Sequence, residues 1–151
     1  MGYRALGVTP TATSEAVRRV MKANRGRDTR PELELRGLLR KAGYPGYRVQ
    51  WKTPAGKCDL AFPGRRVAVF VHGCFWHRCP ICDLPLPRTH HSYWRKKFEL
   101  TKSRDERVRL ALAAQGWKVV TVWECQIKCH PEQVLRDLRG VLDNRAGPPD
   151  T

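Results

Sequence analysis

One short segment of the chain carries most of its chemically reactive side chains. Residues 69–82 begin as an apolar, β-type run and then present two histidines, two bulky aromatic residues and three cysteines. Thiolates bind metal ions, imidazoles accept and donate protons, and aromatic rings stack on nucleobases. Their occurrence together in a strongly basic chain points to an enzyme that acts on nucleic acid and is braced by a metal.

The cysteine spacing predicts a structural zinc site. Cys74, Cys79 and Cys82 supply three thiolates from one loop, the last two as a Cys-x-x-Cys pair. Zinc takes four tetrahedral ligands in a structural site, and the fourth is either Cys125, at the end of a predicted strand, or Cys129. The competing interpretation is a set of buried thiols whose Cys-x-x-Cys spacing arises by chance.

Asp59 is the candidate magnesium ligand. It lies within residues 57–62, a run otherwise suited to a buried strand, where a carboxylate must be paired or must bind a cation. Phosphodiester cleavage uses such a carboxylate to hold Mg²⁺. A turn or a salt bridge would also explain Asp59, but His72 and His77 follow the next predicted strand and favour a catalytic role.

Glu32 and the aromatic pair Phe75 and Trp76 each allow two interpretations. Glu32 completes a capping box that starts at Thr29, or it faces a metal site from its helix. Phe75 and Trp76 are adjacent in a loop, where both cannot easily enter one core. One of them is therefore expected to stack on bases or wedge between them, and packing over the zinc site is the alternative.

The basic character of the chain predicts a polyanionic partner. The formal net charge is +15 and the pI is near 10.2, which favours nucleic acid over a membrane. Met21 is a second candidate wedge, or part of the apolar stripe of a short helix over residues 14–25, and its neighbours Lys22 and Arg25 are expected to bind DNA. Further basic residues form a solvated helix face that partly meets phosphates: Arg95, Lys96, Lys97, Lys102, Arg104, Arg107 and Arg109.

Hydrophobic periodicity predicts the elements that position these residues, and the fold class is α/β, a mixed sheet flanked by helices. One helix starts after Thr29, buries Leu33, Leu35, Leu38, Leu39 and Ala42 on one face, and ends at Gly43. Strands are predicted at residues 47–51, 57–62, 65–71 and 117–124, the first three as an antiparallel meander. An irregular loop over residues 72–91 precedes a helix at 92–115, capped by Ser92 and Gly116, and the last helix is predicted at 131–143.

Length and composition predict a single domain over residues 14–143, with flexible segments at 1–13 and 144–151. The sequence has no apolar run near the ~18 residues that span a bilayer and no evident signal peptide. We therefore expect a cytoplasmic protein, in which cysteines serve as metal ligands or buried thiols rather than in disulfides.

Several motifs, in order along residues 14–143, resemble the very-short-patch repair (Vsr-type) mismatch endonucleases. They are Arg27-Asp28-Thr29 with Glu32, the Asp59 strand, the segment FVHGCFWH at 70–77, and Gly116-Trp117 leading to Val122-Trp123-Glu124-Cys125. The resemblance implies a restriction-endonuclease-like fold in a bacterial enzyme that uses Mg²⁺ and carries a structural zinc. It implies nicking of double-stranded DNA 5′ to the thymine of a T:G mismatch left by deamination of 5-methylcytosine. We expect a monomer, with other repair proteins as possible partners.

The resemblance assigns catalytic roles to five residues. Asp59 corresponds to the Mg²⁺-binding aspartate, His77 to the essential histidine, and His72 to a supporting histidine. Glu32 corresponds to the carboxylate on the N-terminal helix, which favours its functional interpretation. Val71 stands where the family commonly has threonine, so only its main-chain carbonyl can ligate the metal.

The resemblance also assigns DNA contacts and zinc ligands. Phe75 and Trp76 correspond to intercalating aromatic residues, and Met21 to a wedge from the opposite side of the duplex. Cys74 and Cys125 correspond to two zinc ligands. The best-known members have a histidine-rich run after the Phe-Trp-His triplet, whereas this chain has two further cysteines there, which implies an all-cysteine site.

Two other functions keep part of this pattern. A non-catalytic, zinc-dependent DNA-binding module would explain the charge and the cysteines but would leave Asp59, His72 and His77 without a task. A nuclease of the same fold with another mismatch or lesion specificity would keep every motif. An assay for Mg²⁺-dependent nicking distinguishes the mismatch endonuclease from the non-catalytic module. A comparison of mismatched with matched duplexes distinguishes it from a nuclease of other specificity.

Overall fold

The computed structural model describes residues 28–144. The predictions for the flexible segment at 1–13, for all but the first residue of the flexible segment at 144–151, and for the helix at 14–25 with its DNA-binding residues Met21, Lys22 and Arg25 lie outside this range. The described elements, in chain order, are α2 (Arg30–Lys41), β1 (Arg48–Thr53), β2 (Gly56–Phe62), a 3₁₀ turn (Pro63–Arg65), β3 (Val67–His72), α3 (His91–Ala114), β4 (Lys118–Trp123), α4 (Glu124–Cys129) and α5 (Pro131–Asp143). Among these helices, none is long and apolar enough to cross a membrane.

The four strands form one mixed sheet in the order β1-β2-β3-β4. β1, β2 and β3 pair antiparallel, as the predicted meander requires, and short turns suffice to join them. β3 and β4 pair parallel along their whole length, from Val67 opposite Lys118 to His72 opposite Trp123. Parallel neighbours need a long crossover, and here it consists of the loop at 73–90 and helix α3. The predicted mixed sheet flanked by helices is confirmed.

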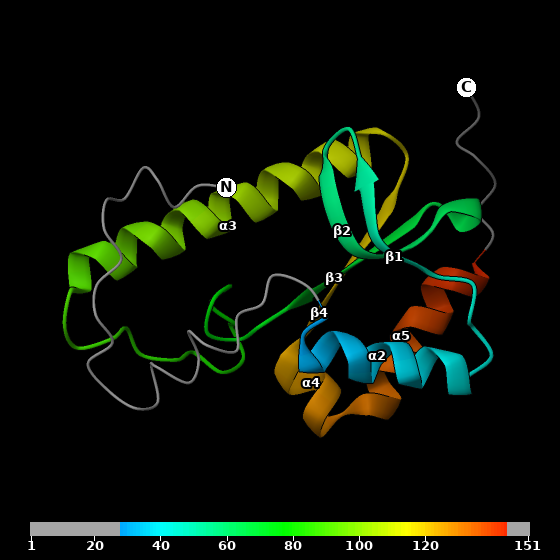
Figure 1. The fold of residues 1–151 in the computed structure, drawn as a ribbon, viewed down its shortest axis with the longest axis horizontal. Coiled ribbons are helices and arrows are strands. Elements are labelled where there is room, and N and C mark those ends of the chain that lie inside the picture. Colours follow the sequence, from blue (N-terminus) through cyan, green and yellow to red (C-terminus); the bar gives the residue numbers. More distant parts are fainter. Residues whose placement is uncertain (1–27, 145–151) are drawn as a thin grey trace.

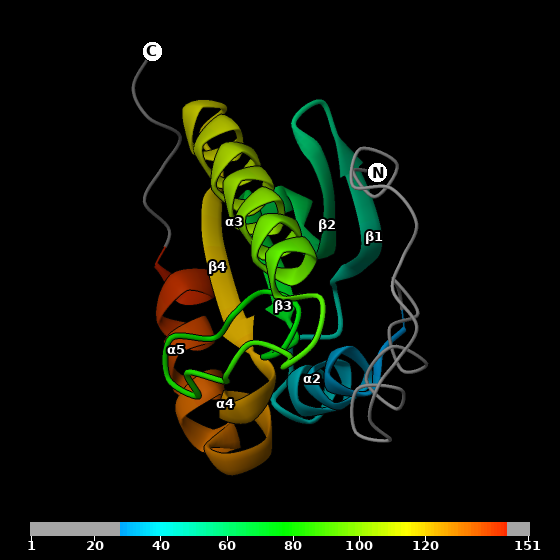
Figure 2. The same cartoon turned by 90° about the vertical axis from the view of Figure 1, so that its left-hand side faces the viewer.

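Helices cover both faces of the sheet (Figures 1 and 2). α2, α4 and α5 pack on one face, and their buried side chains form one core with β2, β3 and β4: Leu35, Leu39, Leu60, Phe62, Val67, Val69, Val71, Val122, Ile127, Val134, Leu138 and Leu142. α3 lies on the other face over a smaller buried cluster: Cys58, Ala61, Ala68 and Leu112. The site described below lies where β3 and β4 end together between these layers.

Helix α2 turns a partly polar face to the sheet. Leu35 and Leu39 are fully buried, and Glu32 and Arg36 lie on the same side because residues three and four apart share a helix face. Leu33 is half exposed, so its assignment to the buried stripe was wrong. The rotation that exposes Leu33 is the one that brings the Glu32 carboxylate into the interior.

Some predicted helix ends differ from the observed ones. α3 begins at His91 and its N-cap is His90, with φ +54°, rather than Ser92. Its C-cap is Gln115, and Gly116 follows with φ +84°, the left-handed conformation that glycine adopts without steric cost. The strand predicted to run to residue 124 ends at Trp123 and continues directly as α4, which the sequence analysis did not predict.

Candidate active site and metal centre

Asp59 lies at the point where β2 separates from β3. The ladder between these strands ends with Leu60 opposite Val69, and beyond it the main-chain N–H of Val71 donates to Oδ2 of Asp59 over 2.8 Å. The side chain therefore replaces a main-chain acceptor and is held in the interior. Burial raises the pKa of Asp59 by more than the Val71 N–H and the charge of nearby His77 lower it.

Glu32 is held by donors that converge on one of its carboxylate oxygens. Oε2 accepts from the N–H of Asp28 at 3.0 Å, from Nη2 of Arg36 at 3.3 Å and from Nε2 of Gln50 at 3.2 Å. Thr29 is the N-cap of α2 but its side chain makes no capping hydrogen bond. The reciprocal capping box predicted between Thr29 and Glu32 is therefore wrong. The Glu32 carboxylate accepts from the N–H of Asp28 instead of that of Thr29, and from the side chain of Gln50 on β1.

The buried carboxylate of Glu32 and the half-buried carboxylate of Asp59 influence each other. Burial, and then the neighbouring charge of Asp59, raise the pKa of Glu32 to about 6 against the opposing effects of Asp28 and Arg36. The side chain of Glu32 is only 3% exposed. Paired acidic oxygens that each resist ionisation are suited to share a cation, and oxygen donors are what Mg²⁺ prefers. The donor set fits the magnesium that the sequence predicts.

His77 returns over the end of β3 because the loop turns sharply after Gly73. The N–H of His77 donates to the carbonyl of Gly73 over 3.1 Å, and the His77 ring stacks on that of His72 with centroids 3.9 Å apart and planes within 5°. The ring of Trp123 also contacts that of His72, edge-on, with centroids 5.2 Å apart. Burial, and then the charge of His77, lower the pKa of His72 to about 4, so His72 is neutral at physiological pH.

Asp105 is a site residue that the sequence analysis missed. Its Oδ2 lies 2.6 Å from Nδ1 of His77. On α3 it continues the inward-facing series of Trp94, Phe98 and Leu112, with helical spacing. A carboxylate on an otherwise apolar stripe was the signal that could have identified it, as it identified Asp59.

The cluster of His72, His77 and Asp105 brings three potential metal ligands within 4.8 Å of one another. A metal would have to lie in the plane of each imidazole, on its nitrogen lone pair, and two face-to-face rings do not direct their lone pairs to one point. The arrangement suits a hydrogen-bonded dyad in which Asp105 fixes the Nδ1–H tautomer of His77 and leaves Nε2 as a proton acceptor.

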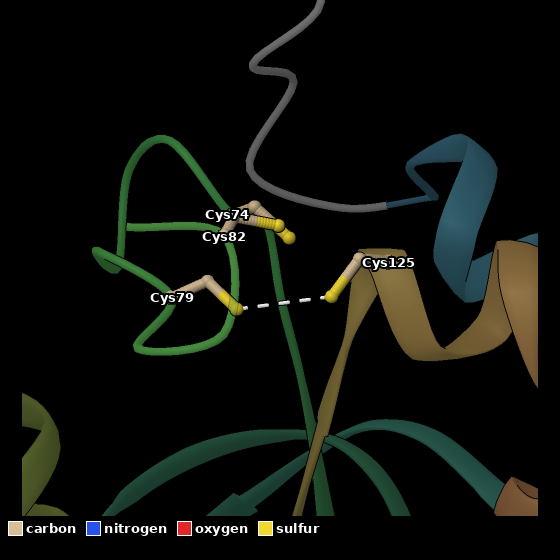
Figure 3. A group of neighbouring side chains, drawn as sticks. All are labelled: Cys74, Cys79, Cys82 and Cys125. Carbon is tan, nitrogen blue, oxygen red and sulfur yellow. Dashed lines mark hydrogen bonds between the residues drawn. The ribbon is translucent and has the colours of Figure 1, made fainter. Parts of the chain in front are cut away.

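Four cysteines form a second centre beside the first. Cys74 follows the end of β3 and Cys125 follows the end of β4, so the parallel pairing of these strands brings them together. With Cys79 and Cys82 their Sγ atoms all lie within 4.8 Å of one another, and their side chains converge (Figure 3). Sγ of Cys79 lies 3.7 Å from Sγ of Cys125, close to the edge of about 3.8 Å that a tetrahedron with Zn–S bonds of about 2.3 Å requires.

The thiols of this cluster differ in their surroundings. Burial raises the pKa of Cys74, and burial with neighbouring thiols raises that of Cys125 to about 11. Burial also acts to raise the pKa of Cys79, but the N–H groups of Cys82 and Ile81 and the neighbouring thiols together lower it by more, and the net shift is downward. Zinc binds thiolates, so the cluster fits a dication that replaces the thiol protons. Cys129 is exposed on α4 and is not among the four clustered thiols of the described chain.

Phe75 and Trp76 join an aromatic cluster on α3. Both rings contact Trp94, at 5.8 and 5.9 Å between centroids, and Phe75 also contacts Phe98 at 5.4 Å. The tight turn directs both rings toward the helix, yet neither belongs to the two buried cores of the described chain, as expected for adjacent loop residues. They remain half-buried. Lys97, expected on the solvated face of α3, is instead buried with Nζ 4.6 Å from the centre of the Trp76 ring.

Comparison with known proteins identifies the family. The family model described as DNA mismatch endonuclease Vsr matches residues 11–82. The DNA mismatch endonuclease Vsr of Escherichia coli is 35% identical over 108 residues, which cover 72% of this chain and 69% of that protein. The chain belongs to the Vsr family.

Other Vsr relatives carry the name of nicking enzymes. The type II nicking enzyme V.XorIIP of Xanthomonas oryzae pv. oryzae is 41% identical over 138 residues, 90% of this chain and 98% of its own length. The type II nicking enzyme V.NaeI of Lentzea aerocolonigenes is 40% identical over 125 residues, 80% of this chain and 74% of its own length.

In this Vsr-family endonuclease the predicted site residues fall into neighbouring groups. The structure places the proposed catalytic side chains around the middle of β2 and the end of β3: Glu32, Asp59, His72 and His77. It places the four predicted zinc ligands in one cluster, and the aromatic pair on α3. The N–H of Val71 bonds Asp59, and its carbonyl as a metal ligand stays a prediction.

Proposed function

We propose that this chain is a Mg²⁺-dependent, strand-specific endonuclease that nicks DNA 5′ to the thymine of a T:G mismatch formed by deamination of 5-methylcytosine. The His77–Asp105 dyad beside the half-buried Asp59 is the observation that carries this proposal. It supplies a proton acceptor of defined tautomer next to a pair of carboxylates. The membership in a family of mismatch endonucleases supports the T:G substrate.

Asp59 and Glu32 would hold the magnesium ion, with the carbonyl of Val71 as a further ligand. When bound, the ion supplies positive charge that stabilises the phosphodiester transition state and favours ionised water. Nε2 of His77 accepts the proton of the attacking water, while the carboxylate of Asp105 stabilises the resulting imidazolium. His72, which stays neutral, supports the His77 ring from beneath without adding a competing charge.

Cys74, Cys79, Cys82 and Cys125 would hold a structural zinc. Their task is to join the loop after β3 to the start of α4, because this loop carries His77 and has little regular structure of its own. A closed four-thiolate site leaves no open position for chemistry, so this zinc acts on stability rather than on catalysis.

Recognition of the duplex would combine stacking with phosphate contacts. Phe75 and Trp76 enter the base stack beside the mismatch, and Met21 enters from the opposite side with Lys22 and Arg25 on the backbone. A T:G wobble pair is easier to unstack than a matched pair, which supports selectivity. The exposed basic residues of α3, among them Arg104 and Arg107, contribute affinity that depends on salt.

A strand-resolved nicking assay tests this function. Duplexes that carry T:G, another mismatch or a matched pair, each labelled on both strands, are incubated with wild type and Asp59→Ala with and without Mg²⁺. We expect wild type to make one nick, 5′ to the thymine, only with Mg²⁺, and Asp59→Ala to make none. Asp137→Ala, which removes an exposed carboxylate on α5, is the matched control.

Two outcomes would contradict the proposal. Equal cleavage of matched and mismatched duplexes would indicate a nuclease of other specificity. If Asp59→Ala nicked within about tenfold of the wild-type rate, the Asp59 carboxylate would have no catalytic role. Binding to DNA without cleavage of any duplex would favour the non-catalytic module.

A further inference from the structure

The backbone of β1 is irregular directly opposite Asp59. Val49 pairs with Leu60 and Trp51 pairs with Cys58, which leaves Gln50 facing Asp59 without a regular pair between them. Gln50 has φ +50°, in the left-handed region. This region is unfavourable for residues other than glycine, so the surrounding structure must hold Gln50 there.

On β2, which pairs with β1 here, the side of the sheet on which the side chains are buried changes at the same point. Cys58 is buried in the cluster under α3, whereas Leu60 is buried in the core under α2 and α5. Residues two apart on a regular strand share a face, so β2 is twisted between them, at Asp59. The distortion of β1 at Gln50 and the distortion of β2 at Asp59 are two sides of one irregularity.

The side chain of Gln50 leads to the other carboxylate of the site. Its Nε2 donates to Oε2 of Glu32 over 3.2 Å. Its Oε1 is fully buried and has no hydrogen-bond partner among the described residues. A buried amide oxygen without a partner is destabilising, and ordered water normally satisfies such groups.

We propose that Gln50 is a positioning residue of the nuclease centre, whose amide nitrogen orients Glu32 and whose amide oxygen accepts a hydrogen bond from a water bound between Glu32 and Asp59. The inference rests on the proposed magnesium-dependent function. Backbone geometry alone would favour glycine or asparagine at this position. The longer glutamine spans the distance to Glu32. From β1 it adds a third donor to those that Asp28, just before α2, and Arg36, on α2, already supply.

Two substitutions separate the amide from the backbone. Gln50→Gly removes the amide and tolerates the positive φ, so the fold should keep its melting temperature or gain a little. Gln50→Met keeps the length and the backbone strain but has no amide. Lys52→Met, at an exposed position of the same strand, is the control. Asp59→Ala serves as the reference for complete loss of nicking.

Each protein is measured for single-turnover nicking of the T:G duplex, for DNA affinity without divalent cation, and for Mn²⁺ affinity by calorimetry without DNA. For both Gln50 variants we expect about tenfold or greater loss of rate and of Mn²⁺ affinity, with DNA affinity unchanged. Lys52→Met should match wild type.

Gln50→Gly with rate and Mn²⁺ affinity within about twofold of wild type would overturn the inference and leave the proposed function intact. If Gln50→Met does not fold, Gln50→Gly decides alone. If wild type cleaves no duplex, the proposed function fails, and the Mn²⁺ affinities of wild type and Gln50→Gly still decide whether Gln50 serves a cation site.

Discussion

Oδ2 of Asp105 lies 2.6 Å from Nδ1 of His77, although the two residues come from a long helix and from a turn 28 positions earlier. This contact places an anion behind the ring whose far nitrogen faces the site. Helix α3 therefore contributes a side chain to the site as well as covering one face of the sheet. The predicted histidine therefore acquires a partner that determines which of its nitrogens accepts a proton.

Asp105→Asn should slow nicking by about 10- to 100-fold, because a hydrogen bond to a charged partner contributes about 1.5–3 kcal/mol. Asparagine keeps an acceptor for the Nδ1–H but removes the charge that stabilises the imidazolium. Single-turnover nicking and DNA affinity are measured in parallel, and affinity should not change. Glu106→Gln, at the next position and paired with Arg109 on the surface, is the control. A rate for Asp105→Asn within about threefold of wild type would show that the contact only supports the fold.

Glu32→Gln should stabilise the protein at neutral pH in a buffer free of Mg²⁺. Burial raises the pKa of Glu32 from 4.5 to about 6, so its contribution to stability is complete below pH 4.5 and is lost as pH rises through 6. Glutamine does not titrate. The stability of the variant relative to wild type should thus rise between pH 4.5 and 6 and level off above, by about 2 kcal/mol.

Urea unfolding of both proteins at pH 4.5, 5.5 and 7 measures this difference, and groups common to both proteins largely cancel. Glu34→Gln, at an exposed position of the same helix, controls for the loss of a surface charge. A difference between Glu32→Gln and wild type that does not vary with pH would mean that the carboxylate is ionised without penalty. Added Mg²⁺ should reduce the difference if the ion binds between Glu32 and Asp59.

The strands and the longer helices could be predicted from the sequence because their patterns are local. The antiparallel meander, α3 and α5 lie within a few residues of their predicted positions. α4 was missed because its six residues follow β4 without a turn signal, and helices this short are stabilised by packing rather than by propensity. Ile127, buried from α4 against the α2 side of the sheet, supplies that packing.

The site was predictable where residue type and sequence spacing were sufficient. The four clustered cysteines and the proximity of His72 to His77 follow from short loops at the ends of parallel strands. Asp105 and Gln50 were not predictable in this way, because each reaches the site through a tertiary contact from an element with another evident purpose. The left-handed backbone of Gln50 leaves no signal in the sequence, since glutamine is not a residue that favours it.

The cysteine cluster should bind about one zinc per chain, and its loss should destabilise the protein. Cys79→Ser removes a buried ligand, and we expect it to lower the free energy of unfolding by about 3 kcal/mol or more, because metal binding is coupled to folding. Cys129→Ser is the matched control, at an exposed position of α4. Elemental analysis and thermal melts of the three proteins measure both effects. Wild type that is fully folded and free of zinc would contradict the assignment, as would equal damage from both substitutions.

Replacement of Phe75 and Trp76 by alanine should reduce mismatch preference more than it reduces DNA affinity. Stacking of a base on an aromatic ring contributes roughly 1–3 kcal/mol, so the double variant should lose roughly tenfold or more of its preference for T:G over matched duplex. Binding to matched DNA at low salt should change little, because it depends on phosphate contacts. Affinities for both duplexes at two salt concentrations measure the two effects separately.

The aromatic cluster makes a stability control essential for this experiment. Phe75 and Trp76 both contact Trp94, so their removal also loosens the cluster. Phe98→Ala empties a buried position of the same cluster and should cost about 3–5 kcal/mol of stability, while the two half-buried rings remain available to the duplex. If Phe75 and Trp76 act as a wedge, the double variant loses preference for T:G and Phe98→Ala, assayed well below its melting temperature, keeps it. Equal loss of preference in both would mean that the rings serve only to pack the loop against α3, and recognition would then have to come from the N-terminal residues around Met21.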